Sequence, residues 1–189
     1  MTDELGTTQR YIVCDALSGA GTDQKGLCRS PLICLERAIE NVPDMILIRF
    51  PEPVDPIHEI YVELCEVLKR NRRTRRCTVT ALIPRKDRFL IDRLHSAGVD
   101  YAATPPCGEM DDGKMLAFLN SLDERHRVHY WRETLCPYLS SVALDESRTM
   151  IVCGAYQNRM VLGGRRLHEL CETENHIGCE YFQTPRIGS

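Results

Sequence analysis

Apolar residues follow two alternating patterns along the first two-thirds of the chain. Short uninterrupted runs, typical of strands buried on both faces, occupy residues 11–17, 44–50, 77–84 and 101–106. Longer segments repeat their apolar residues at helical spacing, and these occupy residues 30–42, 55–71, 85–100 and 113–133. Short buried strands that alternate with helices are typical of a parallel sheet covered on both faces. The pattern therefore predicts a three-layer α/β fold with a doubly wound sheet between helices.

The same pattern predicts helix boundaries and buried faces. Asp55 is placed to cap the second of these helices, and Pro56 to occupy its first position. We expect residues 113–133 to form one last helix that leads into the C-terminal third. The apolar faces expected to cover the sheet are Leu32, Ile33, Leu35, Ala38 and Ile39 in the first helix and Ile57, Ile60, Tyr61, Leu64, Val67 and Leu68 in the second.

Polar residues stand at the ends of three of the expected strands. Asp15 lies at the end of the first run, Arg49 at the end of the second and Thr104 at the end of the fourth. Binding sites of open α/β sheets lie at the carboxyl ends of the strands, so these residues mark the edge where a site is expected. They include no nucleophile paired with a base and no pair of carboxylates. The pattern therefore gives no catalytic residues.

Three short segments together resemble response-regulator receiver domains. The segment PDMILIRFPEP is similar to the central strand of that family, AGVDYAATPP to its last strand, and YIVCD to its first strand. Their order and spacing extend the resemblance over residues 10–122. The resemblance implies a flavodoxin-like sheet and a role in signal transduction.

The residues that this family uses for phosphorylation are replaced. The resemblance places Arg49 where a phospho-accepting carboxylate is expected and Thr104 where a lysine is expected, and only Asp15 fits an acidic position. A guanidinium cannot accept a phosphoryl group, and its positive charge would repel magnesium. The resemblance therefore implies a degenerate receiver, or pseudo-receiver, that is not phosphorylated. We expect Arg49 to form an ion pair with Asp15 on the neighbouring strand end instead.

The connection between Asp15 and Arg49 is shorter than in the family. The segment SGAGTDQKGLCRS stands in for one helix and one strand, so the sheet is expected to have four or five strands. Gly19, Gly21 and Lys25 in this segment follow a strand and could bind an anion through backbone amides. Their spacing matches neither a P-loop nor the dinucleotide-binding fingerprint, so a plain loop is the alternative.

The C-terminal third lacks this alternation and contains four of the ten cysteines. Cys136, Cys153, Cys171 and Cys179 are separated by sixteen, seventeen and seven residues, and each lies beside a turn signal. A segment of this size buries little core by itself, and a metal site is one means of stabilising it. The dispersed spacing lacks the CxxC pattern of zinc ribbons and favours an iron–sulfur cluster of the 4Fe-4S type. Zinc, or no metal at all, are the alternatives.

Local patterns in this third predict some structure around the cysteines. The segments TMIVCGAY and RMVLGG predict a hairpin that turns around Gln157–Asn158, and RRLHELCE predicts a short helix that ends near Cys171. His168 and His176 lie in the same region and could replace one cysteine as a ligand.

The six remaining cysteines belong to the first part of the chain. Cys34, Cys65 and Cys77 are expected to be core residues. A second metal site or a redox thiol is the alternative to simple packing for the cysteines near strand ends or in the loop, which are Cys14, Cys28 and Cys107.

Composition and charge bear on compartment and partners. Ten cysteines without a secretory leader are expected as free thiols in the cytoplasm. The sequence has no apolar run long enough to span a membrane. With a net charge of −3 and no aromatic residues in the basic run 69–76, we expect no nucleic-acid partner. We expect a protein partner, and a helix bearing Tyr130 and Trp131 is a candidate face for a homo-oligomer.

These observations predict two domains, a receiver-like α/β domain at residues 8–124 and a linker helix with a cysteine-rich unit at residues 125–189. We expect a non-catalytic regulatory or adaptor protein whose cysteine-rich unit senses redox state or iron. One alternative is a protein-interaction module stabilised by zinc. The other is a redox enzyme that binds a small anion in the crevice around Asp15 and Arg49.

Overall fold

The fold was analysed in a computed structural model of the chain. It describes residues 11–15, 26–51, 57–105, 112–145, 148–157 and 159–186. Several predictions from the sequence lie outside these residues, namely those for Gly19, Gly21, Lys25, Asp55, Pro56 and Cys107.

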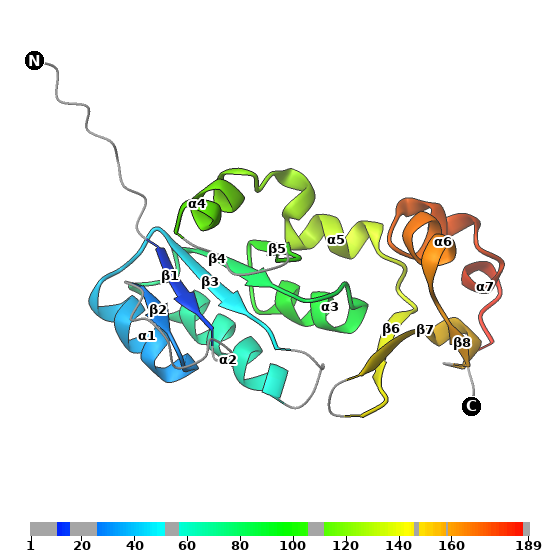
Figure 1. The fold of residues 1–189 in the computed structure, drawn as a ribbon, viewed down its shortest axis with the longest axis horizontal. Coiled ribbons are helices and arrows are strands. Elements are labelled where there is room, and N and C mark those ends of the chain that lie inside the picture. The colour runs from blue at the N-terminus through cyan, green and yellow to red at the C-terminus, as the bar shows by residue number, and fades with distance from the viewer. Residues whose placement is uncertain are drawn as a thin grey trace, which may run out of the picture.

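The larger sheet has five parallel strands in the order β2-β1-β3-β4-β5, which is the order of flavodoxin-like sheets (Figure 1). The strands are β1 (Tyr11–Cys14), β2 (Leu27–Cys28), β3 (Met45–Arg49), β4 (Thr78–Leu82) and β5 (Tyr101–Ala103). The predicted α/β class and parallel sheet are therefore confirmed, with five strands rather than four. The fifth is β2, which consists of two residues within the segment that was expected to replace a helix and a strand.

Helices lie on both faces of this sheet. On one face, α1 (Pro31–Glu40), α2 (Ile57–Arg70) and α3 (Arg88–Ser96) enclose the main core (Figure 1). On the other face, α4 (Asp112–Asn120) covers a smaller cluster that includes Leu47 of β3. The two clusters arise because successive residues of a buried strand point to opposite faces, and both faces of β3 are apolar.

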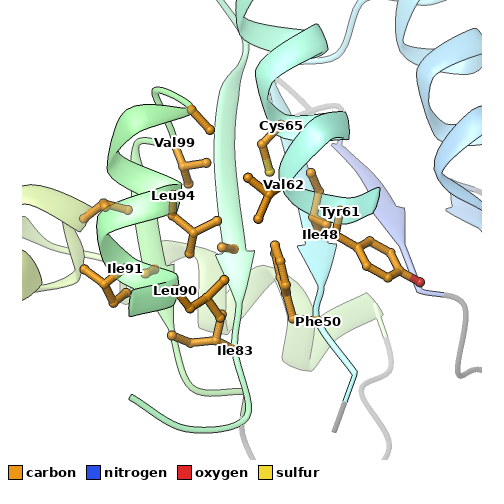
Figure 2. Packing of buried hydrophobic residues seen from close by; sticks show 14 of the residues in the cluster. Ile48, Phe50, Tyr61, Val62, Cys65, Ile83, Leu90, Ile91, Leu94 and Val99 are labelled. Atoms are coloured by element: carbon orange, nitrogen blue, oxygen red, sulfur yellow. The ribbon is translucent and has the colours of Figure 1, made fainter. Parts of the chain in front are cut away.

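The buried face of α1 differs from the predicted one. Cys34 and Ala38 are fully buried, whereas Leu32 and Ile33 are 65% and 42% exposed. The helix turns its small side chains toward the sheet, which allows it to lie close to β1 and β2. In α2, the buried apolar residues are Tyr61, Val62, Leu64, Cys65 and Leu68, several of which appear in Figure 2. The prediction was wrong for Ile60 and Val67, which are 52% and 44% exposed.

The segment predicted as one last helix is interrupted. It contains α4, a short 3-10 turn at Glu124–His126 and a separate helix, α5 (Val128–Thr134). The prediction was wrong because Asp123 forms a reciprocal capping arrangement with His126, and such an arrangement begins a new helical segment. The second helix then packs on α3 and buries Val128 and Trp131 in the main core.

The C-terminal segment contains a small antiparallel sheet in the order β6-β7-β8 (Figure 1). Its elements are β6 (Leu139–Ala143), β7 (Thr149–Cys153), a 3-10 turn (Gly154–Tyr156), β8 (Met160–Val161), α6 (Gly164–Arg166), the π-helical turn η3 (Leu167–Cys171), the 3-10 turn η4 (Glu174–Gly178) and α7 (Glu180–Gln183). The predicted hairpin and the helix ending near Cys171 are confirmed. β6 was not predicted, because its residues are half-buried or exposed apart from Leu139.

The main buried cluster continues from the large sheet into the C-terminal segment. It includes strand residues such as Ile46 and Val79 together with Leu139, Cys153 and Leu167. The segments on either side of α5 therefore share one apolar core. No helix among the described residues has the length and apolar character needed to cross a bilayer.

Candidate functional site

Four cysteines from separate elements lie close to one another in the C-terminal segment. Cys136 precedes β6, Cys153 ends β7, Cys171 ends η3 and Cys179 precedes α7. Burial, together with the nearby thiols of Cys136, Cys153 and Cys179, raises the pKa of Cys171 to about 12. We call these four cysteines, which the sequence predicts as metal ligands, the cysteine quartet.

Backbone contacts fix the elements that bear the quartet. The Cys136 N–H donates a hydrogen bond to the Cys171 carbonyl oxygen at 2.8 Å. Cys153 is paired with Leu139 in the antiparallel ladder of β6 and β7. The Cys179 carbonyl accepts from the N–H of Phe182 at 3.0 Å, within the turn that starts α7.

Two arginines place positive charge beside these thiols. Burial raises the pKa of Cys136, while the Arg88 guanidinium opposes that rise. Arg166 acts in the same way on Cys171. Two cations next to four ionisable thiols would offset part of the negative charge that accumulates when several thiols become thiolates.

The two histidines of this region are engaged elsewhere. His176 is buried, with Nδ1 2.7 Å from the Thr173 carbonyl oxygen and its ring 5.0 Å from that of Phe182. His168 lies at the surface, with Nδ1 3.3 Å from a Glu172 carboxylate oxygen. Neither is among the groups that influence the Cys171 thiol.

The quartet is not a closed coordination sphere. Among the residues that the structure describes, no group of three or more His, Cys, Asp or Glu side chains is arranged so that it could hold a metal ion. The nine cysteines in the described ranges are free thiols. The chemistry of the donor set nevertheless suits a thiophilic metal, since all four side chains are soft thiols and three of them are buried.

A short connection joins the quartet to the large sheet. Residues 85–88, which we call the β4–α3 connection, bind the C-terminal segment through each of their side chains. Arg85 Nη1 donates to the Thr149 carbonyl at 3.1 Å, and Lys86 Nζ lies 3.3 Å from a Glu172 carboxylate oxygen. Sequence patterns did not single out this connection, because they assigned residues 85–100 to one helix, whereas α3 begins only at Arg88.

The other two residues of this connection bind next to the quartet and to β6. Asp87 accepts hydrogen bonds from the Ser141 N–H at 2.9 Å and from the Ser141 hydroxyl. Arg88 Nη1 donates to the Leu135 carbonyl at 2.9 Å, one residue before Cys136. These bonds connect the residue before Cys136, and β6, to the start of α3.

The strand-end residues predicted from the sequence fall into two places. Arg49 Nη1 and Asp15 Oδ2 lie 3.0 Å apart, so the predicted ion pair is confirmed. Their side chains are 26% and 7% exposed, respectively. Arg49 Nε is buried and has no hydrogen-bond partner among the residues described. Thr104 instead lies on the wall of a separate cavity.

That cavity lies at the junction between the large sheet and the C-terminal segment. Its volume is about 770 Å³, and its walls include Lys86, Thr104, Trp131, Glu172 and Asn175. Lys86 is already engaged there, since it pairs with Glu172 and lies 5.3 Å from the Trp131 ring centroid. The cavity therefore presents no unpaired lysine charge to a small anion.

Comparison with other proteins gives no family assignment. No protein-family model matches the chain, and no curated protein matches its sequence.

Proposed function

We propose that this chain is a non-catalytic regulatory or adaptor protein that senses redox state or iron through the cysteine quartet. The observation that supports this proposal is the influence of Cys136, Cys153 and Cys179 on the Cys171 thiol. Four thiols from four separate elements lie in one segment, and thiolates are ligands that iron–sulfur clusters and zinc prefer.

An iron–sulfur cluster of the 4Fe-4S type is the cofactor we propose for the quartet. Each of its ligands would come from a different element, without the CxxC turn that holds zinc in ribbons and fingers. Tyr138, Leu170 and Phe182 pack against the apolar core that includes Cys136, Cys153 and Cys171, and apolar surroundings limit solvent access to a cluster. Arg88 and Arg166 would balance part of its negative charge. When bound, the cluster would supply one-electron redox chemistry. Its loss on oxidation is the second way in which it would report redox state.

The large sheet serves in this proposal as a pseudo-receiver. Support comes from the Asp15–Arg49 ion pair, which would stand where the resemblance to receiver domains places a phosphorylation site. The β4–α3 connection would couple this domain to the state of the quartet, because Arg88 contacts the residue before Cys136 and Asp87 holds β6. A partner protein would bind the surface of this domain differently in the two states of the quartet.

Anaerobic purification of the full chain tests the cofactor. We expect brown protein that contains iron and acid-labile sulfide, with both lost in Cys179→Ser, which alters the most accessible cysteine of the quartet. Cys77→Ser is the matched control, since Cys77 is also a cysteine but lies in the core of the large sheet. Colourless protein with one bound zinc per chain would show that the quartet is a structural zinc site and not a cluster site. Protein without metal would refute both forms of the proposal.

Treatment with acetyl phosphate and magnesium tests the pseudo-receiver assignment. Because Arg49 is already paired with Asp15, the intact mass of the chain should not change. A phosphoryl adduct on an aspartate would contradict the assignment.

A further inference from the structure

A second group of thiols lies in the large sheet domain, apart from the cysteine quartet. Cys14 ends β1, Cys28 ends β2, and these two residues are register partners in adjacent parallel strands. Cys34 lies one turn into α1, on the face that covers them. The exposed fractions of these three residues are 0%, 1% and 0%, so all three are enclosed.

Hydrogen bonds between thiols distinguish the three cysteines. Cys34 interacts by side-chain hydrogen bonds with both Cys14 and Cys28. The bond from Cys34 is the main cause that lowers the pKa of Cys28 to about 7, against the opposing effect of burial. The same contacts raise the pKa of Cys34, which therefore retains its proton. Cys34 is the donor and Cys28 the sulfur that becomes a thiolate.

A positive charge is held beside Cys28 by the fold. Arg37 Nη1 donates a hydrogen bond at 2.9 Å to the carbonyl oxygen of Leu27, the residue before Cys28 in β2. This contact directs the guanidinium toward the end of β2, where its charge and hydrogen bond stabilise the Cys28 thiolate. Arg37 lies one turn after Cys34 in α1, so both groups reach Cys28 from the same helix.

We propose that Cys28 and Cys34 form a peroxide-reactive dithiol, in which Cys28 is the attacking thiolate and Cys34 the resolving thiol. The Cys28 sulfur attacks one oxygen of hydrogen peroxide, the O–O bond breaks, and hydroxide leaves and takes up a proton to give water. Cys28 is then a sulfenic acid. The Cys34 sulfur attacks the Cys28 sulfur, the S–O bond breaks, and the Cys34 proton leaves with the hydroxyl as a second water. One peroxide has been reduced and two thiols oxidised to a disulfide.

The burial of Cys28 and Cys34 determines which oxidants can reach them. Hydrogen peroxide is small and uncharged, so it can reach an enclosed thiolate during local opening. A glutathione disulfide is large and charged, and exchange requires direct access to the attacked sulfur. We therefore expect peroxide to oxidise the pair and glutathione disulfide to leave it reduced. The pair shares no residue with the quartet, so it does not depend on the proposed cofactor.

Peptide mapping of the full chain after peroxide treatment tests the proposal. Trypsin cleaves after Lys25, Arg29 and Arg37, which places Cys28 in peptide 26–29 and Cys34 in peptide 30–37. Cys14 falls in peptide 11–25. After brief treatment and alkylation of remaining thiols, we expect a disulfide-linked product of peptides 26–29 and 30–37. Recovery of both peptides only in alkylated form, or of 30–37 linked to 11–25 instead, would overturn the assignment.

Variants separate the two roles. In Cys34→Ser, the sulfenic acid on peptide 26–29 should persist and be trapped by dimedone, since its resolving thiol is missing. In Arg37→Gln, consumption of the Cys28 thiol at neutral pH should slow several-fold, whereas Cys77→Ser should leave the rate unchanged. Because the linked peptides are sought in the wild-type chain, a variant that fails to fold does not decide the result. A rate unaffected by Arg37→Gln would contradict the role of the guanidinium.

Discussion

At the scale of single residues, the Asp15–Arg49 pair shows how one substitution changes the chemistry of a strand end. Arg49 is three-quarters enclosed and its Nε has no partner among the described residues, so its main compensation is Asp15. We predict that Arg49→Met lowers the free energy of unfolding by about 1–3 kcal/mol, because it leaves the Asp15 carboxylate enclosed without this cation. Urea unfolding gives the value.

A double-mutant cycle isolates the pair from other effects. The variant Asp15→Asn/Arg49→Met should recover part of the loss, since replacing both members of an enclosed ion pair costs less than removing one. Additive losses from the two single substitutions would mean that the ion pair contributes no coupling.

The Cys28 thiol gives a prediction about pH. Its pKa is lowered from 9.0 to about 7, chiefly by the hydrogen bond from Cys34, so the thiolate population should rise between pH 6 and pH 8. We predict that the rate at which methyl methanethiosulfonate modifies Cys28 increases with pH and has its midpoint near 7. Cys34→Ala, which removes the donor, should move the midpoint toward 9, because the hydrogen bond is lost. A wild-type midpoint near 9 would show that Cys34 does not stabilise the thiolate.

At the scale of elements, Asp87 connects α3 to β6. One carboxylate oxygen accepts from the Leu90 N–H at 2.9 Å and caps α3, and the other accepts from Ser141. We predict that Asp87→Ala costs about 2–4 kcal/mol, since it removes a helix cap and leaves the Ser141 N–H without its partner. Hydrogen exchange at Ser141 and its neighbours in β6 should accelerate.

Ser30→Ala is the matched control for this cap. Ser30 caps α1 in the same way, accepting from the Ile33 N–H at 3.2 Å, and among the described residues its hydroxyl binds no second element. Its loss should cost about 1 kcal/mol and leave exchange in β6 unchanged. Equal costs for the two substitutions would show that the bond from Asp87 to Ser141 adds nothing.

Local patterns predicted most elements but not their contacts. The apolar runs at β3 and β4 and the helical spacing of α2 and α3 are long enough to identify type and order. β2 was missed because two residues contain no period, and its existence depends on pairing with β1. The face of α1 was misjudged because hydrophobicity favoured larger side chains, whereas close approach to the sheet selected the small ones.

The sites, like the elements, were predictable from the sequence only in part. The ion pair of Asp15 with Arg49 was predictable, since both residues end neighbouring strands and carry opposite charges. The quartet was proposed because the C-terminal third is rich in cysteine. No sequence pattern predicted a contact between the thiols of Cys28 and Cys34, because this contact depends on the register of β2 and on the rotation of α1 about its axis. Contacts that cross from one element to another are set by packing, which a linear period does not encode.

At the scale of the whole molecule, one apolar core joins the large sheet to the C-terminal segment, and Trp131 reports on their junction. It is the single tryptophan of the chain and is 7% exposed. Its Nε1–H donates to the Arg125 carbonyl at 2.8 Å, and Lys86 lies over its ring. Its fluorescence therefore changes when the junction opens.

We predict that urea unfolds the chain in one cooperative transition, with the same midpoint by Trp131 fluorescence and by far-ultraviolet circular dichroism. A shared core makes separate unfolding costly, because opening the junction would expose the apolar residues of both parts. Lys86→Met keeps the apolar stem over Trp131 but removes the ion pair with Glu172, so it should lower both midpoints slightly and equally. An early fluorescence change followed by a later loss of helix signal would instead mean that the C-terminal segment detaches first, as an independent unit.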